Sequence, residues 1–116
     1  MKHFKISEFA CKCCGKTEMQ PSTLEMIDMA RDVANIPFYL SSGYRCEAHN
    51  RAVGGVQDSA HTKGYAVDIK YSGEASRKII IEAVKKAGFR RIGLANTFIH
   101  VDNDPSKPQD VSWKYK

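Results

Sequence analysis

Two short segments of the sequence place a titratable side chain inside an otherwise apolar alternation. In YAVDIKY, residues 65–71, Asp68 falls on the strand face opposite the branched apolar side chains. In TFIHV, residues 97–101, His100 interrupts a second apolar run in the same way. A buried charge is costly unless it is paired or binds a metal ion. The two segments therefore predict strands that carry metal ligands or ion-paired groups, and this limits how the chain can fold around them.

A second histidine precedes this aspartate. His61 lies seven residues before Asp68, with Gly64 between them. A shared helix would separate the two side chains by roughly 10 Å along its axis, and Gly64 disfavours a helix there. A loop histidine followed by a strand aspartate is the better arrangement for one ion. Taken alone, His61 or Asp68 is better explained as an ordinary polar residue. If the two strands are neighbours, however, both residues converge with His100, and two histidines, one carboxylate and an open position form a catalytic zinc site.

Hydrophobic periodicity and turn residues divide the rest of the chain into short elements. Residues 1–20 show no regular pattern. In the last helix, apolar spacing predicts inward-facing side chains at Ile79, Ile80, Val84 and Ala87. The expected helices run from Pro21 to the Ile36–Pro37 stop, over Cys46–Val53 and over Ala75–Ala87; the expected strands are Phe38–Leu40, Tyr65–Tyr71, Arg91–Leu94 and Thr97–Val101; and the last dozen residues are expected to form a loop that returns Trp113 to the body.

The length of 116 residues and the apolar fraction of 42% suit one globular domain over residues 1–116, without repeats or linkers. Grouped strands and helices predict the α+β class, as an antiparallel sheet with flanking helices. No apolar run approaches the roughly 18 residues that indicate a membrane span, so no membrane partner is expected. We expect the protein to be a monomer.

The basic charge is spread along the sequence. The net charge is +5, and only Lys85–Lys86 and Arg90–Arg91 form basic pairs. Such a balance suits any polyanion, including nucleic acid and an anionic cell wall, and does not choose between them. A nucleic-acid-binding domain is not expected, because no basic stripe with interleaved aromatic residues is present.

Three motifs occur in order along the chain: SGYRCEAHNRAVGG, SAHTKGYAVDI and FIHVD. Together with the opening HFKISEFACKCCG, they resemble the zinc D-alanyl-D-alanine carboxypeptidases and the related phage and bacterial L,D-endopeptidases, which cut peptidoglycan peptides. The pattern S-x-H-x-x-G-x-A-x-D is matched in full between Ser59 and Asp68. The resemblance covers about Phe4 to Asp102 and implies the fold that these enzymes share with the hedgehog signalling domain.

The resemblance implies zinc ligands at His61, Asp68 and His100. It also implies that Arg45, in SGYR, binds the carboxylate of the substrate, a role that suits a bidentate and permanently charged guanidinium. A surface salt bridge is the alternative for Arg45. Ser59 either hydrogen-bonds the substrate or shapes the turn.

The chain departs from its relatives at one position. Many relatives carry a glutamate or aspartate three residues before the last histidine as the general base, and this chain has Thr97 there. Asp102, on the same strand face as His100, is the candidate catalytic base, or else a partner that orients His100. Asp104 and Glu47 are further acidic candidates.

The function expected from this resemblance is a zinc-dependent peptidoglycan peptidase that hydrolyses a stem-peptide bond, as a D-Ala-D-Ala carboxypeptidase or an L,D-endopeptidase. The alternative is a non-catalytic, zinc-stabilised binding module on the same fold. The N-terminus lacks the apolar core of a secretory signal. We therefore expect synthesis in the cytoplasm and action at the cell wall after release, as for a phage endolysin that leaves through a pore made by another protein.

Four cysteines, Cys11, Cys13, Cys14 and Cys46, permit two disulfides. A chain without a signal peptide is expected to meet a reducing cytosol, so reduced, partly buried thiols are predicted. A second, structural zinc held by CKCC together with Cys46 or His3 is the alternative, although this spacing is not a strong zinc-finger pattern.

Overall fold

A mixed sheet forms the centre of the molecule. The computed structural model describes residues 1–115, and its sheet has five strands in the order β1-β2-β4-β3-β5. The α+β class predicted from the sequence is confirmed. The helices are α1 (Pro21–Ala34), α2 (Glu47–Ala52) and α3 (Glu74–Lys86), with 3-10 turns η1 (Ile6–Phe9) and η2 (Ala60–Lys63); the strands are β1 (Tyr39–Ser42), β2 (Ala66–Lys70), β3 (Arg91–Leu94), β4 (Phe98–Asp102) and β5 (Val111–Lys114).

The two strands that carry the titratable residues are neighbours, as the sequence analysis required. β2 pairs antiparallel with β4, and the register places Asp68 opposite His100 and Ala66 opposite Asp102. Side chains of directly opposed residues project to the same face of a sheet, about 5 Å apart. The register alone therefore brings Asp68 and His100 together.

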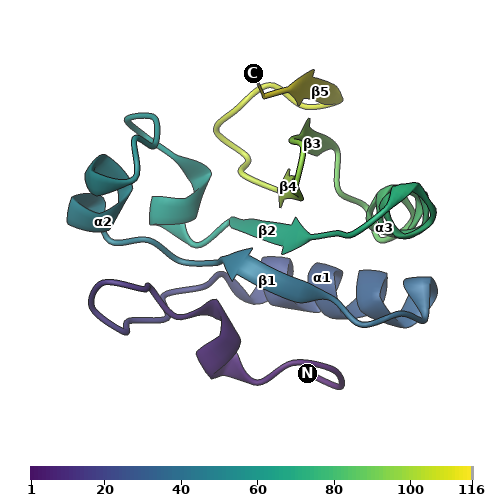
Figure 1. The fold of residues 1–116 in the computed structure, drawn as a ribbon. Helices are drawn as coiled ribbons and strands as arrows, with labels where there is room; N and C mark the ends of the chain where they lie inside the picture. The colour runs from purple at the N-terminus through teal and green to yellow at the C-terminus, as the bar shows by residue number, and fades with distance from the viewer. Residues whose placement is uncertain (116) are drawn as a thin grey trace.

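The opposite face of the sheet is covered by α1 and α3, which also pack against each other. Val67 and Ile99 face this apolar layer and are fully buried. Alternation along both strands therefore separates an apolar face, which holds the fold together, from a polar face, which carries the titratable cluster. Figure 1 shows α2 and η2 at the end of the sheet where β1 finishes and β2 begins, with the N-terminal segment passing beneath β1.

The helix boundaries follow local chemistry. α1 begins with Pro21, whose missing N–H is not needed in a first helical turn. It ends at Asn35, which takes the left-handed conformation (φ 54°), and Pro37 follows shortly after. In α3 the prediction for Ile79 was wrong: this side chain is 39% exposed, and Ile80, Ala83 and Val84 provide the buried face instead.

The prediction of a C-terminal loop was also wrong. The last residues form β5, which pairs in parallel with β3 and makes the sheet mixed rather than antiparallel. The backbone N–H of Tyr115 donates to the Leu94 carbonyl at 2.9 Å, which extends the pairing beyond the strand. Trp113 lies over Gly93, where a Cβ atom would come within 2.7 Å of the indole ring. The small residue on β3 thus provides the space in which the strand carrying Trp113 can lie.

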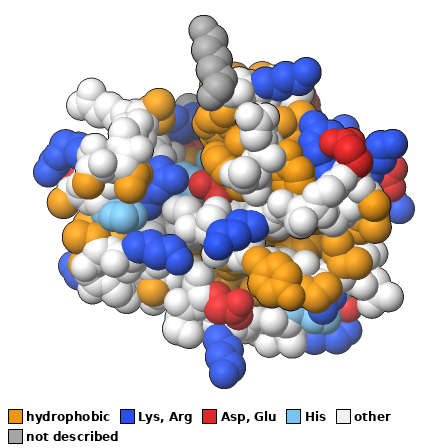
Figure 2. All heavy atoms as spheres, viewed as in Figure 1, with side chains coloured by type: hydrophobic (Ala, Val, Ile, Leu, Met, Phe, Trp, Pro, Cys, Tyr) orange, Lys and Arg blue, Asp and Glu red, His pale blue; other side chains and the backbone are white. Residues whose placement is uncertain are grey.

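Within residues 1–115, no helix is both long and apolar enough to cross a membrane. Figure 2 shows Lys and Arg side chains dispersed over the viewed face, between apolar and neutral ones, in agreement with their scatter along the sequence.

Candidate active site

A short turn places His61 in front of the sheet. The Ser59 hydroxyl caps η2 by accepting the backbone N–H of His61 at 3.2 Å. Gly64 ends the turn with φ 79°, and a Cβ there would overlap the backbone carbonyl of Glu18. Only glycine combines this left-handed conformation with so close an approach to the N-terminal segment. The seven-residue separation of His61 and Asp68 therefore comprises the end of this capped turn and the first residues of β2.

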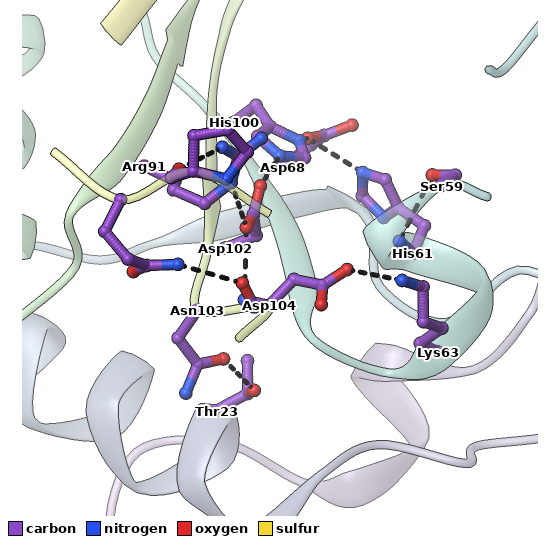
Figure 3. Close-up of polar contacts among 12 residues, drawn as sticks. Thr23, Ser59, His61, Lys63, Asp68, Arg91, His100, Asp102, Asn103 and Asp104 are labelled. Carbon is purple, nitrogen blue, oxygen red and sulfur yellow. Dashed lines mark hydrogen bonds and ion pairs between the residues drawn. The ribbon is translucent and has the colours of Figure 1, made fainter. Parts of the chain in front are cut away.

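Three side chains converge on the polar face of the sheet. The Asp68 Oδ1 atom lies 3.2 Å from Nε2 of His61 and 2.9 Å from Nδ1 of His100. All three side chains are buried, with residue exposures of 2–6%. One ligand atom from each lies within 4.8 Å of the other two, a spacing that suits a shared metal ion. Figure 3 shows these side chains pointing toward one another from η2, β2 and β4.

The remaining nitrogen of each imidazole is already used. Nδ1 of His61 lies 2.7 Å from the Gly43 carbonyl, and Nε2 of His100 lies 2.7 Å from Oδ2 of Asp102. A carbonyl and a carboxylate only accept hydrogen bonds, so these two nitrogens carry the protons. In its neutral form each ring therefore directs a lone pair toward Asp68. Two lone pairs and a carboxylate facing one point require a cation or added protons, so the donor set fits a divalent metal ion.

The pKa shifts of the three side chains also indicate a site for a positive charge. Burial lowers the pKa of His61 and outweighs its contact with Asp68. Burial opposes ionisation of Asp68 and His100 as well, but their mutual hydrogen bond, with those from His61 and Asp102, outweighs it. These contacts hold the pKa of Asp68 well below its usual range and raise the pKa of His100. The cluster is thus arranged to hold negative charge on Asp68 beside an adjacent positive group.

Asp102 lies behind His100, seen from Asp68. Its Oδ2 contacts the imidazole, while its Oδ1 accepts from Nε of Arg91 at 2.8 Å and from the backbone N–H of Asp104 at 3.2 Å. Burial opposes its ionisation, but these contacts lower the pKa of Asp102. A carboxylate hydrogen-bonded to the outer nitrogen of a ligand histidine is the arrangement that fixes ring orientation in metal sites. The geometry thus favours the orienting role for Asp102 over the role of general base.

Arg45 stands on the other side of Asp68. Its guanidinium donates from Nε to the Ser42 hydroxyl at 3.1 Å and from one terminal nitrogen to the Asn50 side-chain carbonyl at 3.1 Å. The other terminal nitrogen lies 3.4 Å from Oδ2 of Asp68. Each terminal nitrogen has a further N–H that these contacts do not use. The guanidinium is therefore held in place at the cavity wall and still has unused N–H donors.

These groups line a cavity of about 440 Å³. Its wall includes Ser59, one of the residues for which the sequence left two roles open, and here its hydroxyl shapes the turn. The cavity wall contains the site residues predicted from the sequence, which are Arg45, Ser59, His61, Asp68, His100 and Asp102. It also contains Arg91, Trp113 and Tyr115, which were not predicted as site residues.

The other acidic candidates, and the position where relatives carry the base, lie elsewhere. That position, Thr97, is exposed immediately before β4 and does not line the cavity. Asp104 is buried and its Oδ2 lies 2.8 Å from Nζ of Lys63, so an ion pair occupies it. Glu47 is exposed and lines a different cavity, beside Asn50.

Sequence reasoning missed Arg91, Trp113 and Tyr115 as site residues. Arg91 lies directly opposite Asp102 in the β3–β4 register, and its guanidinium carbon lies 5.2 Å from the centre of the Trp113 ring. The indole in turn packs at 5.4 Å from the imidazole of His100. The spacing of Trp113 and Tyr115 by two residues was the available signal, because it predicts a strand with both rings on one face.

Comparison with known proteins places this arrangement in a family. The family model described as peptidase M15 matches residues 2–102, which include every residue of the three-ligand cluster. The chain belongs to the peptidase M15 family. A search of curated proteins returned no match. Membership supports a metallopeptidase, and the M15 match ends at Asp102, before the strand that carries Trp113.

Proposed function

We propose that this M15 protein is a zinc-dependent peptidoglycan peptidase that hydrolyses a stem-peptide bond. The observation that carries the proposal is the convergence of His61, Asp68 and His100 on one point of a cavity wall, with Arg45 beside them. A buried set of two imidazoles and one carboxylate is the ligand set of catalytic zinc sites that keep one position open. Zinc, when bound, would polarise the scissile carbonyl and lower the pKa of a bound water to about 7.

Arg45 supplies recognition. A fixed guanidinium with unused donors binds a carboxylate with a defined orientation, because its N–H groups are arranged as a planar fork. Because Arg45 contacts Asp68, a substrate carboxylate bound by Arg45 would lie next to the proposed metal ligands. We therefore favour a scissile bond whose neighbouring residue carries a free carboxylate. A terminal D-Ala provides one, which makes D-Ala-D-Ala carboxypeptidase activity the first assay and L,D-endopeptidase activity the second.

Asp102 supplies orientation in this proposal. Its two oxygens hold the outer nitrogen of His100 and the guanidinium of Arg91, so the imidazole presents Nδ1 toward Asp68 in one fixed direction. The role of general base stays a competing prediction for Asp102, since the carboxylate also lines the cavity. The two roles differ in how much turnover added zinc restores to an Asp102→Asn variant.

The proposed place of action is the cell wall, where the substrate lies. An endolysin-like protein made in the cytoplasm and released through a pore formed by another protein fits this proposal. The partner is a peptidoglycan stem peptide, and the dispersed basic charge suits an anionic wall.

The competing function is a zinc-stabilised binding module without catalysis. The observation that favours it is Thr97 at the position where relatives carry a general base. Zymography on cell-wall material separates the two functions, with and without a chelator. Lysis that the chelator abolishes supports the peptidase, and mass spectrometry of the released muropeptides identifies the bond. Zinc-dependent wall binding without product release would select the binding module.

A further inference from the structure

Three of the four cysteines gather at a second point, away from the cavity. Although CKCC and Cys46 are far apart in sequence, the sulfur atoms of Cys11, Cys14 and Cys46 lie within 4.8 Å of one another. His3, the other partner considered from the sequence, instead pairs with Asp32 at 3.0 Å. All four thiols are free, but the prediction of partial burial holds only for Cys11 and Cys46, since Cys13 and Cys14 are exposed. The cluster is independent of the peptidase site and calls for an explanation of its own.

The distances suit a metal better than a disulfide. The sulfurs of Cys11 and Cys46 are 3.7 Å apart. Two thiolates bound tetrahedrally at about 2.3 Å from zinc are separated by about 3.8 Å, whereas a disulfide needs about 2.05 Å. The CKCC run, which holds three of the four cysteines, also contains a second pattern. Cys11 and Cys14 are spaced C-x2-C, the usual separation of paired zinc ligands on one loop.

The loop has the backbone form that such a pair requires. Gly15 follows Cys14 in the left-handed conformation (φ 77°), and its N–H donates to the Cys11 carbonyl at 2.9 Å. The Cys11 N–H donates to the Lys16 carbonyl at 2.7 Å, which closes a tight turn. Both thiols are therefore held on one side of a short loop rather than on a flexible tail.

Backbone N–H groups also point at the sulfurs. Cys46 donates to the sulfur of Cys11 and His49 donates to the sulfur of Cys46, each at 3.4 Å. A thiolate stabilised in this way is the form that binds metal.

We propose that Cys11, Cys14 and Cys46 bind a structural zinc ion that fastens the N-terminal segment to the start of α2. The three sulfurs account for three of the four tetrahedral positions of such an ion, and the Cys13 sulfur does not share their mutual spacing. One of the three cysteines, Cys46, directly follows Arg45 in the sequence. The ion would therefore help to fix the segment that carries the guanidinium. The Tyr44 N–H already ties this segment to the N-terminal part of the chain by donating to the Phe9 carbonyl at 2.9 Å.

The test is zinc stoichiometry in the full-length protein, loaded with zinc under reducing conditions and then desalted. The wild type should hold one zinc ion more than Cys14→Ser, and Cys13→Ser is the matched control that should keep the full content. His100→Ala should lose the other ion and retain the sulfur-bound one, so the two sites fail separately. Cys14 is exposed, which makes its serine variant unlike a core substitution.

A spectroscopic readout keeps the proposal testable even if a variant folds poorly. In His100→Ala loaded with Co²⁺, the remaining ion should show sulfur-to-cobalt charge-transfer absorption, and zinc X-ray absorption should give Zn–S distances of about 2.3 Å. Equal zinc content in wild type and Cys14→Ser would overturn the proposal. So would equal losses in Cys13→Ser and Cys14→Ser, absence of the charge-transfer band, or a Cys11–Cys46 disulfide that persists in protein purified under reducing conditions.

Discussion

The two ligand clusters of this protein are built in different ways. The histidine–aspartate cluster stands on paired strands, and the β2–β4 register fixes two of its members. The cysteine cluster stands on a loop and a helix start, and backbone N–H groups directed at sulfur fix its members. The first cluster opens into a cavity of about 440 Å³, whereas the cysteines do not line that cavity.

This difference separates two kinds of metal chemistry. A catalytic metal needs an open position and ligands held rigidly by further contacts, and the proposed first site offers such contacts at Gly43 and Asp102. A structural metal needs ligands that bring distant segments together, and it contributes directly to folding. We therefore expect damage to the first cluster to remove activity, and damage to the second to reduce stability.

The largest effect is expected for His100→Ala. Loss of this ligand should remove the ion of the first cluster and lower turnover of muropeptides by about 10³-fold or more, because metal charge stabilisation is worth several kcal/mol. Metal analysis and a turnover assay on the same preparation measure both quantities. Full zinc occupancy of the first cluster, or wild-type turnover, would contradict the ligand assignment.

Asp102→Asn tests whether Asp102 orients His100 or acts as the general base. If Asp102 orients His100, zinc affinity should weaken by about 10–100-fold, and added zinc should restore turnover. If Asp102 is the general base, turnover at saturating zinc should stay lower by about 10²–10⁴-fold. From the contacts of its two oxygens we expect restoration. The measurement is turnover as a function of free zinc.

Arg45→Lys keeps the charge and removes the planar fork. Substrate binding should weaken by about 1–3 kcal/mol, which corresponds to roughly 5–150-fold in the dissociation constant. Zinc content and the unfolding transition serve as controls and should not change. Unaltered KM for muropeptides would leave Arg45 with a purely structural role.

Two glycines allow a matched comparison of the loops that carry the clusters. Gly64 and Gly15 both have positive φ, but a Cβ on Gly64 would overlap the Glu18 carbonyl, whereas a Cβ on Gly15 would meet nothing within 4 Å. Gly15→Ala should cost about 1–2 kcal/mol, the penalty of the left-handed conformation alone. Gly64→Ala should cost more, because the backbone must also move. Denaturant unfolding of both variants gives the difference, and equal costs would argue against the close approach.

The smallest effect concerns acid stability at the edge of the first cluster. Burial opposes ionisation of Asp104, but its contacts with Lys63 and Ser106 outweigh it and lower the pKa of Asp104. A carboxyl group with a lowered folded-state pKa stabilises the fold above its unfolded-state pKa, and this contribution is lost as the pH falls below about 4. Asp104→Asn should therefore be less stable than wild type at neutral pH, by up to about 1 kcal/mol. The difference in unfolding free energy should shrink toward pH 3, and a constant difference would assign the effect to packing.

The sequence predicted the parts of this molecule that depend on alternation and spacing. Alternation around Asp68 and His100 indicated two strands with one polar face, and the structure pairs them in that way. The positions of the long helices followed from periodicity and from Pro21 and Gly88. These features are local, because each depends on residues close together in the chain.

The features that were missed depend on pairing between distant segments. β5 is short and largely exposed, so only its parallel contact with β3 defines it as a strand. Arg91 became a site residue through its register with Asp102. The choice of Cys46 over His3 as the partner of CKCC likewise required the fold, because Cys46 lies near Cys11 whereas His3 pairs with Asp32. Ile79 was wrongly predicted to be buried for a related reason. Helical spacing identifies the apolar side of α3, but not how much of that side its neighbours cover.

The position of β5 has a consequence for the shape of the cavity. The family match ends at Asp102, yet Trp113 and Tyr115 line the cavity. Parallel pairing of β5 with β3 over Gly93 therefore builds one cavity wall from residues outside the family match. Substitutions at Trp113 and Tyr115 can then reshape this wall while His61, Asp68 and His100, which stand on η2, β2 and β4, stay unchanged.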